Sequence, residues 1–572
     1  MSHRLSSRRF SPVSPFAAAL ALTLLAAGCA PGATGSPGSA AAPPDRAVPG
    51  SETAAGVLTP AGGPAAAPAS AGPASASPSN ASPGAATESV FNAFRGDSAR
   101  LYTFLLAMPK GGDLHSHLSG AIYAESFLAW AVEDGLCVTL ETLTLGAPPC
   151  DAKAGRPAVA EAQRDGVLRD RIIDAFSTRN YKPDTQIGHR RFFSTFGRFD
   201  AAGRGRTGEM LAEVAARAAR GQVRYLELMH TPGGLAVGNV GAGVGWTDDF
   251  GAMRQRILDA GLLDTLQAIS RLTDRDEARR DLVLGCGGAD ADPGCTVTQR
   301  YLYQVLRAFP REMVFAQILA GFELASRDSR YVGLNLVQPE DDRVAMEDYS
   351  LHMRIIGFLR EMYPQVPVTL HAGELAPGLV PPEGLRFHIR EAVGVAGARR
   401  IGHGVDVLYE DDPDALLRVM AQRKVMVEIN LTSNDVILGV SGGRHPLRTY
   451  LAYGVPVALS TDDEGVSRSE MTLEYRKAVE EQGVDYPTLK AMARNSLEYA
   501  FVEGESLWSD YAALERVPEC AEAGGGFSGD ACRGFLRGSE KARLQASLEA
   551  DLTQFEERVA AGAWPWAAGL GR

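Results

Sequence analysis

The stretch GGDLHSH, residues 111–117, is the first of eight segments that decide the fold, and it ends in two histidines one residue apart. Side chains alternate between the two faces of a β-strand, so His115 and His117 would point the same way and share one metal ion. On its own, such a pair is more typical of polar residues on the wet face of a strand. A metal site is indicated only if other segments place ligands beside it.

Seven β-rich segments follow, with helix-like stretches between them. Helical apolar spacing is clear in MLAEVAARAAR (210–220) and DALLRVMAQR (414–423). Repeated strand-then-helix units predict an α/β fold, a parallel sheet closed into a (β/α)8 TIM barrel. The short interval between the third and fourth strands is the weakest part of this count. The seven segments are VRYLELM (223–229), VFAQILAGF (314–322), YVGLNLV (331–337), PVTLHAG (367–373), RRIGHGV (399–405), VMVEINL (425–431) and VPVALST (455–461).

Functional side chains of such a barrel gather at the carboxyl ends of the strands, on one rim. Four predicted strands end in imidazoles or carboxylates, although the whole chain has only 10 histidines. These residues are His115 and His117, His371 with Glu374, His403, and Asp462 with Asp463. His230 follows the second strand and is a further candidate for the pocket. His189, His352, His388 and His445 fall in helix-like or loop-like contexts and are interpreted as surface or packing residues.

Three imidazoles and a carboxylate are a donor set typical of catalytic zinc, which keeps one position open for water. The natural set is His115, His117, His371 and Asp462, and zinc would make its bound water acidic enough to react at neutral pH. Glu374 lies close to this set without being needed by it, so it would donate a proton to the electrophile. His403 would orient the water or take its proton. Asp463 would be a second carboxylate aimed at the substrate.

Four motifs, in this order, resemble those of the adenosine deaminase family of the metal-dependent amidohydrolase superfamily. They are MPKGGDLHSHLSG (108–120), HAGE (371–374), IGHGVDV (401–407) and LSTDDEGV (459–466). The resemblance covers about residues 90–505, and MPKGG together with an export signal is similar to the secreted, growth-factor-related branch.

The resemblance implies a barrel of the metal-dependent hydrolase type with one zinc ion per subunit, held by the four residues above. Glu374 would protonate the purine ring at N1 while water attacks C6, with Asp462 and His403 as the other catalytic residues. The substrate-binding residues would be His117, Ser119, Gly120, Gln338 and Asp463, of which Asp463 would bind N7 and Gly120 would let the backbone approach the nucleoside. Adenosine, and also 2′-deoxyadenosine, would lose ammonia, and adenosine would give inosine.

Two positions depart from the family pattern, and both concern the substrate rather than the metal. Ser119 stands where the family often has an acidic residue that contacts the sugar. Its hydroxyl still offers a hydrogen bond to ribose, but the charge is lost. Gln338 stands where a glycine commonly presents its backbone to the purine, so its side chain would reshape the pocket.

Residues 1–28 have the pattern of a secretory signal peptide, because arginines precede the apolar run FAAALALTLLAAG. That run is shorter than the roughly 20 residues of a membrane span. The ending Ala26-Ala27-Gly28-Cys29 resembles a bacterial lipobox, which predicts cleavage before Cys29 and a lipid on its sulfur. An ordinary cleaved signal with a free cysteine is the alternative.

Residues 29–88 are predicted to be a lipid-anchored linker, nearly all Ala, Pro, Gly and Ser, a composition that offers few large side chains to bury. The catalytic barrel would occupy residues 89–565. The protein is therefore expected to be exported and held on a bacterial membrane by its lipid, or otherwise to be periplasmic or secreted.

Six cysteines remain after Cys29, in three couples that are close in sequence, and none has the CxxC spacing of a thiolate metal site. In an exported protein such couples favour disulfides, although other connectivities stay open. The expected pairs are Cys137 with Cys150, Cys286 with Cys295, and Cys520 with Cys532.

The composition is that of a globular protein, with 45% hydrophobic and 22% charged residues. The formal net charge of -12 and the lack of a basic block argue against a nucleic-acid partner, so a small neutral or cationic ligand fits better. Two alternatives to adenosine deamination stay open. One is an amidohydrolase that acts on another aminopurine or a modified nucleoside. The other is a surface protein that binds nucleosides without turnover, although every expected catalytic position is filled.

Overall fold

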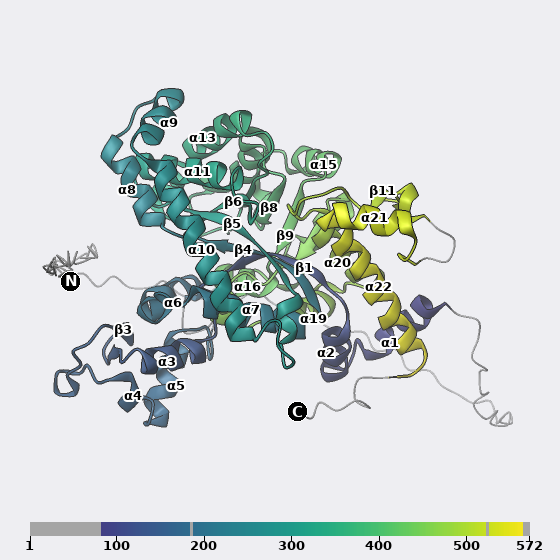
Figure 1. Ribbon diagram of the computed structural model, residues 1–572, viewed down its shortest axis with the longest axis horizontal. Coiled ribbons are helices and arrows are strands. Elements are labelled where there is room, and N and C mark those ends of the chain that lie inside the picture. The colour runs from purple at the N-terminus through teal and green to yellow at the C-terminus, as the bar shows by residue number, and fades with distance from the viewer. Residues whose placement is uncertain (1–81, 183–186, 522–525, 564–572) are drawn as a thin grey trace, which may run out of the picture. The chain divides into compact units, whose positions relative to one another are not determined.

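Eight parallel strands form the centre of the molecule, which the computed structural model describes over residues 82–182, 187–521 and 526–563 (Figure 1). They pair in the orders β1-β4-β5-β6 and β7-β8-β9-β10. Parallel bridges join the two groups, between Leu334 and Val368 at one junction and between Ser116 and Asp462 at the other. The sheet is therefore closed, and the predicted (β/α)8 TIM barrel is confirmed. The strands are β1 (Gly111–His117), β4 (Val223–His230), β5 (Thr298–Leu306), β6 (Tyr331–Val337), β7 (Thr369–Ala372), β8 (Arg400–His403), β9 (Met426–Ile429) and β10 (Val457–Leu459).

Helices surround the barrel and bury their apolar faces against it. Both helices that were predicted from apolar spacing are present, as α7 (Thr207–Arg220) and α15 (Pro413–Arg423). Helix α15 begins where the Asp412 carboxylate accepts a hydrogen bond from the backbone N–H of Ala415. The other helices between strands are α8 (Gly234–Val244), α9 (Phe250–Asp259), α10 (Leu262–Leu284), α11 (Arg311–Ala325), α12 (Arg343–Glu347), α13 (Tyr349–Met362), α14 (His388–Glu391), α16 (Leu431–Leu438) and α17 (Leu447–Tyr453), and α18 (Glu464–Ser467), α19 (Met471–Gln482) and α20 (Tyr486–Glu498) follow β10.

The predicted third strand, residues 314–322, is wrong, because this segment lies within helix α11. The third strand of the barrel is β5 instead. Helix α11 is buried on every face, so its sequence has no polar stripe from which a helical period could be recognised. Strand β5 carries polar residues such as Arg300 and Gln304, which made it a weak strand candidate in the sequence.

A long insertion separates β1 from α7 and forms the lobe at the lower left of Figure 1. Its last helix, α6, contributes Phe192, Phe193 and Phe196 to the lining of the pocket described below. The insertion consists of α3 (Ala124–Glu133), β2 (Cys137–Thr139), β3 (Thr144–Gly146), α4 (Val159–Ala162), α5 (Gly166–Ala175) and α6 (Gly188–Gly203).

Helices from both ends of the described chain lie together beside the barrel, where α1 (Pro83–Phe94) runs along the yellow helix α22 (Glu540–Ala560) in Figure 1. The ring centroids of Phe104, in α2 (Ser98–Ala107), and Phe555 lie 5.2 Å apart. Helices α20 and α22 share an apolar cluster with residues from the early parts of the strands, such as Leu114 and Met426. They therefore support the barrel away from the rim that carries the histidines.

The three expected disulfides are confirmed: Cys137 bonds to Cys150, Cys286 to Cys295, and Cys520 to Cys532. The last one ties α21 (Asp530–Gly538) to the loop that follows the small hairpin β11 (Trp508–Asp510) and β12 (Glu515–Arg516).

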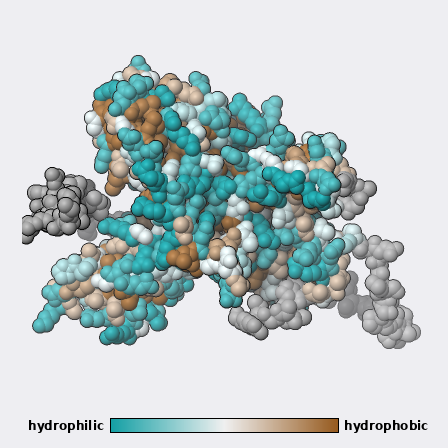
Figure 2. All heavy atoms as spheres, in the orientation of Figure 1, coloured by the Kyte–Doolittle hydropathy of each residue, from teal (hydrophilic) through white to brown (hydrophobic). Residues whose placement is uncertain are grey.

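The predicted signal peptide, Cys29 and most of the predicted linker lie outside the described residues. Helix α1 starts at Pro83 and so includes the last residues of that linker. Among the helices that the structure describes, none is both long and apolar enough to span a membrane. Hydrophilic residues cover most of the face seen in Figure 2, and hydrophobic residues gather at the upper left, over α8 and α9.

Candidate metal centre and active site

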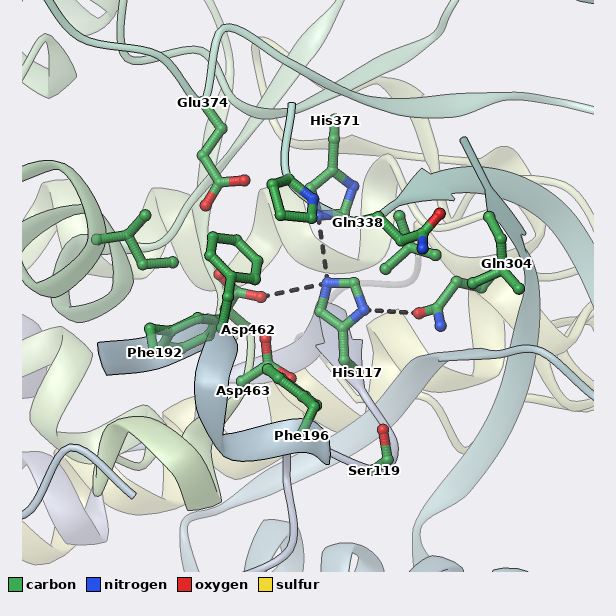
Figure 3. Close-up of a pocket in the computed structure, with 15 residues that line it drawn as sticks. His117, Ser119, Phe192, Phe196, Gln304, Gln338, His371, Glu374, Asp462 and Asp463 are labelled. Atoms are coloured by element: carbon green, nitrogen blue, oxygen red, sulfur yellow. Dashed lines mark hydrogen bonds and ion pairs between the residues drawn. The ribbon is translucent and has the colours of Figure 1, made fainter. Parts of the chain in front are cut away.

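The carboxyl ends of β1, β7 and β10 bring the four predicted metal ligands together. His371 Nε2 lies 3.1 Å from His115 Nε2 and 3.2 Å from His117 Nε2. Asp462 Oδ1 lies 3.2 Å from His117 Nε2 and 3.8 Å from His115 Nε2. All four side chains are buried, and dashed lines in Figure 3 join His117 to His371 and to Asp462.

The spacing of these atoms fits a zinc ion. Ligand atoms about 2.0–2.1 Å from a tetrahedral zinc ion lie about 3.4 Å from one another, and the four distances given above, from 3.1 to 3.8 Å, bracket this value. Three imidazole nitrogens and one carboxylate oxygen are also the donor types that catalytic zinc prefers. The residues present therefore fit the ion that the sequence predicts.

Each of the three imidazoles has an acceptor oxygen at its other ring nitrogen. The Nδ1 atoms of His115, His117 and His371 lie 2.7 Å from Glu428 Oε2, 2.6 Å from Gln304 Oε1 and 3.0 Å from Asn335 Oδ1, respectively. An acceptor at Nδ1 places the ring proton there, which leaves the Nε2 lone pair free for a cation. The three rings are thus oriented as metal ligands.

Glu428 is itself held by a buried guanidinium. Arg400 Nε donates to Glu428 Oε1 at 2.6 Å, and Arg400 Nη2 lies 2.5 Å from Glu227 Oε2. Burial acts to raise the pKa of Glu428, but Arg400 and His115 together lower it to about 2. Glu428 is therefore a charged acceptor that fixes the orientation of the His115 ring.

Glu374 lies just past β7, on a turn whose backbone hydrogen-bonds to the side chain of Glu340. Glu340 accepts the backbone N–H groups of Gly373 and Glu374 at 3.0 and 2.9 Å, and His388 Nδ1 lies 2.5 Å from the same carboxylate. Gly373 has a φ of 77°, which favours glycine. Burial, and then the nearby Asp462 charge, raise the pKa of Glu374 well above its usual value. The raised pKa favours the protonated, uncharged form of this carboxyl.

His403 lies beside the metal cluster, at the end of β8. Its Nε2 atom lies 3.7 Å from Asp462 Oδ2, and its Nδ1 atom lies 3.8 Å from Glu374 Oε1. Burial lowers the pKa of His403 to about 3, so the ring is neutral. His403 is also close enough to His115, His371 and Asp462 to bind an ion together with them. Its position alone therefore does not decide whether it is a metal ligand.

Strained backbone accompanies two of these residues. His403 has a φ of 68° and Asp462 a φ of 59°, in the left-handed region that side chains other than glycine rarely adopt. Asp462 is fixed there by backbone hydrogen bonds to β1: its N–H donates to His115 O at 2.8 Å, and its carbonyl accepts from His117 N–H at 3.0 Å. Such conformations cluster at functional sites, where the surrounding fold supports them.

Asp463 packs against Gly120, and this contact leaves no room for a side chain at position 120. A Cβ atom at Gly120 would lie 1.5 Å from Asp463 Oδ1. This oxygen is buried and has no hydrogen-bond partner among the described residues, and the side chain lines the pocket. Burial is the main cause that raises the pKa of Asp463 well above its usual value.

The two positions that depart from the family pattern both line the pocket. Gln338 has a φ of 81°, a conformation suited to glycine. Its side-chain oxygen accepts a hydrogen bond from the backbone N–H of Ala308 at 2.9 Å, so this oxygen already has a partner within the protein. Ser119 is exposed at the mouth of the pocket.

The pocket above the metal cluster has a volume of about 440 Å³. Its polar floor is formed by His117, His371, Glu374, Asp462 and Asp463. Its walls are largely apolar, with Phe192, Phe193 and Phe196 from α6 and also Leu306, Val337, Pro339 and Ile437. The space is of the size that small-molecule sites have in proteins.

His230 lies next to this pocket and lines a second cavity, which shares Ser119, Phe196, Gln304 and Leu306 with the first. The packing interpretation holds for His352, which is buried. His388 and His445 are buried too, but each hydrogen-bonds to a residue near the metal cluster: His388 to Glu340, and His445 to Asn434.

Five polar residues that hold the site were missed in the sequence. Asn335 and Glu428 are polar residues inside the apolar runs YVGLNLV and VMVEINL, and that contrast was a usable signal. Gln304 lies in the strand that was not recognised. The other two are Glu340 and Asn434, whose amide nitrogen lies 2.8 Å from His403 Nδ1. No local signal marks them, because their partners are distant in sequence.

A closed eight-stranded parallel barrel with a buried His/Asp cluster at one rim defines a metal-dependent hydrolase fold of the amidohydrolase type. The model of the family described as adenosine deaminase matches residues 204–508, more than half of the chain. The chain therefore belongs to the adenosine deaminase family.

Curated relatives match over a shorter stretch. Adenosine deaminase from Shewanella loihica is 35% identical over 147 residues, which are 26% of this chain and 41% of the relative. The enzyme of that name from an Escherichia coli strain is 35% identical over 139 residues, which are 24% of this chain and 38% of the relative. The chain thus aligns with about two fifths of the length of these relatives.

Solved structures resemble the chain at low sequence identity. A zinc-bound amidohydrolase from Burkholderia ambifaria is 19% identical, with a TM-score of 0.48 over 80% of this chain and 94% of that one. An adenine deaminase from Arthrobacter aurescens is 18% identical, with a TM-score of 0.46 over 77% of this chain and 98% of that one.

Proposed function

We propose that this chain is a zinc-dependent deaminase that converts adenosine to inosine and ammonia, and that also accepts 2′-deoxyadenosine. The observation that carries the proposal is the position of Glu374. It is a buried acid, with a raised pKa, that lines the same pocket as His117, His371 and Asp462. Its proton is available to a ring nitrogen of a substrate bound above the metal cluster.

His115, His117, His371 and Asp462 would hold the ion. When bound, zinc supplies the Lewis acidity that makes water a nucleophile at neutral pH. Glu374 protonates N1 of the purine, which makes C6 more electrophilic. His403 and Asp462 orient the attacking water, one of whose protons returns to the Glu374 carboxylate. The other passes from the new C6 hydroxyl to the 6-amino group, which leaves as ammonia.

Asp463 positions the base. Purine N7 is a hydrogen-bond acceptor, so only a protonated carboxyl can donate to it. The raised pKa of Asp463 and its partnerless Oδ1 are the properties that this role requires. The phenylalanines of α6 supply an apolar wall against which a purine ring can pack. Ser119 would contact the sugar by a hydrogen bond rather than by a charge.

We further propose that the protein works outside the cytoplasm. Three disulfides are typical of oxidising compartments, and the first 28 residues read as an export signal. The sequence before Cys29 supports a lipid anchor on that residue. Membership in the secreted, growth-factor-related branch of the family belongs to the same proposal.

A second substrate class deserves a place in the test, because Ser119 and Gln338 alter the pocket that would hold the nucleoside. The zinc-loaded protein should be given adenosine, 2′-deoxyadenosine, adenine, adenosine monophosphate and N6-methyladenosine, with the released ammonia measured, or the released methylamine in the case of N6-methyladenosine. We expect the highest kcat/KM with adenosine. Turnover of only the free base, the nucleotide or the methylated nucleoside would contradict the proposed substrate. It would still agree with a zinc-dependent hydrolytic reaction.

A further inference from the structure

His403 differs from the three histidine ligands in the atom that faces its Nδ1. For the ligands this atom is an oxygen, but for His403 the nearest one is the amide nitrogen of Asn434, at 2.8 Å. The amide nitrogen of Asn430 lies farther away, 3.4 Å from Nδ1 and 3.5 Å from Nε2. An amide nitrogen can only donate, so Nδ1 of His403 accepts. An imidazole ring keeps at least one proton, so the proton of His403 lies on Nε2.

The orientation of the Asn434 amide is fixed by a second histidine. The backbone N–H of Leu447 donates to His445 Nδ1 at 3.2 Å. A backbone N–H cannot reverse its direction, so the proton of the neutral His445 ring lies on Nε2, which is 3.0 Å from Asn434 Oδ1. The oxygen of Asn434 thus faces His445, and its nitrogen faces His403.

Burial protects this series of hydrogen bonds from competing water. His403, Asn434 and His445 are all buried, and burial lowers the pKa of His445 to about 4. Asn434 lies on α16, and His445 lies just before α17. The segment after β9 therefore determines the tautomer of His403, which lies on β8. Buried groups without a suitable partner are costly, which disfavours the reversed arrangement.

We propose that Asn434 and His445 are positioning residues that hold His403 in the tautomer with its proton on Nε2. A protonated Nε2 has no lone pair for a cation, so His403 stays outside the ligand set although its ring is close enough to join. The Nε2 proton faces Asp462 Oδ2. His403 therefore acts on the attacking water by donating a hydrogen bond and not by taking its proton. The effect on turnover rests on the proposed function, whereas the tautomer does not.

The test combines Asn434→Asp with His445→Phe. An aspartate accepts at both oxygens, so N434D should move the His403 proton to Nδ1. H445F removes the hydrogen bond that orients the Asn434 amide, without changing a direct contact of His403. It should give a mixture of the two His403 tautomers. The ring nitrogens of His403 are read by 15N NMR on zinc-loaded protein labelled at histidine, and a His403→Gln variant assigns the signals.

We expect Nε2 protonation in the wild type and Nδ1 protonation in N434D. In N434D, kcat should fall by about 10- to 100-fold, as for other residues that orient a metal-site group, with KM changed less than about twofold. Asn495→Asp is the matched control, because Asn495 Nδ2 donates to Val457 O at 2.8 Å away from the site. It should lower Tm and leave the His403 signals and kcat unchanged.

A wild-type His403 with its proton on Nδ1 would overturn the inference, as would unchanged His403 signals in N434D. A loss of kcat without a change of tautomer would show that Asn434 has a structural role only. If the signals change as expected but the wild type deaminates no purine, the positioning stands and the proposed function fails.

Discussion

Asp463 Oδ1 occupies the place where a side chain on Gly120 would begin, since a Cβ there would lie only 1.5 Å away. Gly120→Ala should therefore displace the Asp463 carboxyl from the pocket. We predict a loss of kcat/KM of about 100-fold, which is the cost of a displacement of about 1 Å in a catalytic site. Gly243→Ala is the control, because a Cβ at Gly243 meets nothing within 4 Å. Equal activity in the two variants would show that Asp463 has no role in turnover.

Removal of the metal should abolish activity and lower stability together. The four ligand side chains are buried, so an ion that binds only the folded state stabilises it. At free zinc about 1,000 times above Kd the gain is about 4 kcal/mol. We predict a lower Tm after dialysis against a chelator, and recovery of both Tm and activity when zinc is returned. A Tm that does not respond to zinc would argue against a bound ion.

Gln304, in the strand that the sequence did not reveal, should matter for zinc affinity. It orients the His117 ring through the 2.6 Å contact with Nδ1. Gln304→Leu should weaken zinc binding by about 10- to 100-fold, measured by competition with a chelating dye. Gln299→Leu in the same strand loses a hydrogen bond to Leu211 O and should lower Tm without changing zinc affinity. If both variants bind zinc equally, the orienting role of Gln304 is disproved.

Glu340 should contribute stability that depends on pH. Burial acts to raise the pKa of Glu340, but His388 and Arg307 lower it to about 2 in the fold, against 4.5 as the usual value. The charge therefore stabilises the fold fully above about pH 4.5, and this contribution, about 3 kcal/mol, is lost as the pH falls toward 2. Glu340→Gln should show a smaller decrease of unfolding free energy over that range than the wild type. Parallel curves for the two proteins would rule out the effect.

The sequence was sufficient to predict the barrel and a cluster of histidines and carboxylates at one rim, because both have local signatures. His371 and Glu374 occupy one short turn, and His115 and His117 share one strand face, so spacing alone relates them. The strand ends then placed the separate groups on one rim.

The residues that orient the site could not be predicted in the same way. Asn335 meets His371, and Glu428 meets His115, only because β6 and β9 lie where the closed barrel puts them. The error at 314–322 also has a tertiary cause: α11 is covered on all sides, so burial removed the polar face that would have identified a helix.

The most direct test of the central claim measures inosine and ammonia from adenosine with zinc-loaded wild-type protein and with Glu374→Gln. We expect equal amounts of both products from the wild type. In E374Q, turnover should fall by about 100- to 10,000-fold, the usual contribution of a general acid, while zinc content and purine binding are retained. Full activity in E374Q would contradict the assigned proton donor. No product from a zinc-loaded, correctly folded wild type would contradict the deaminase itself.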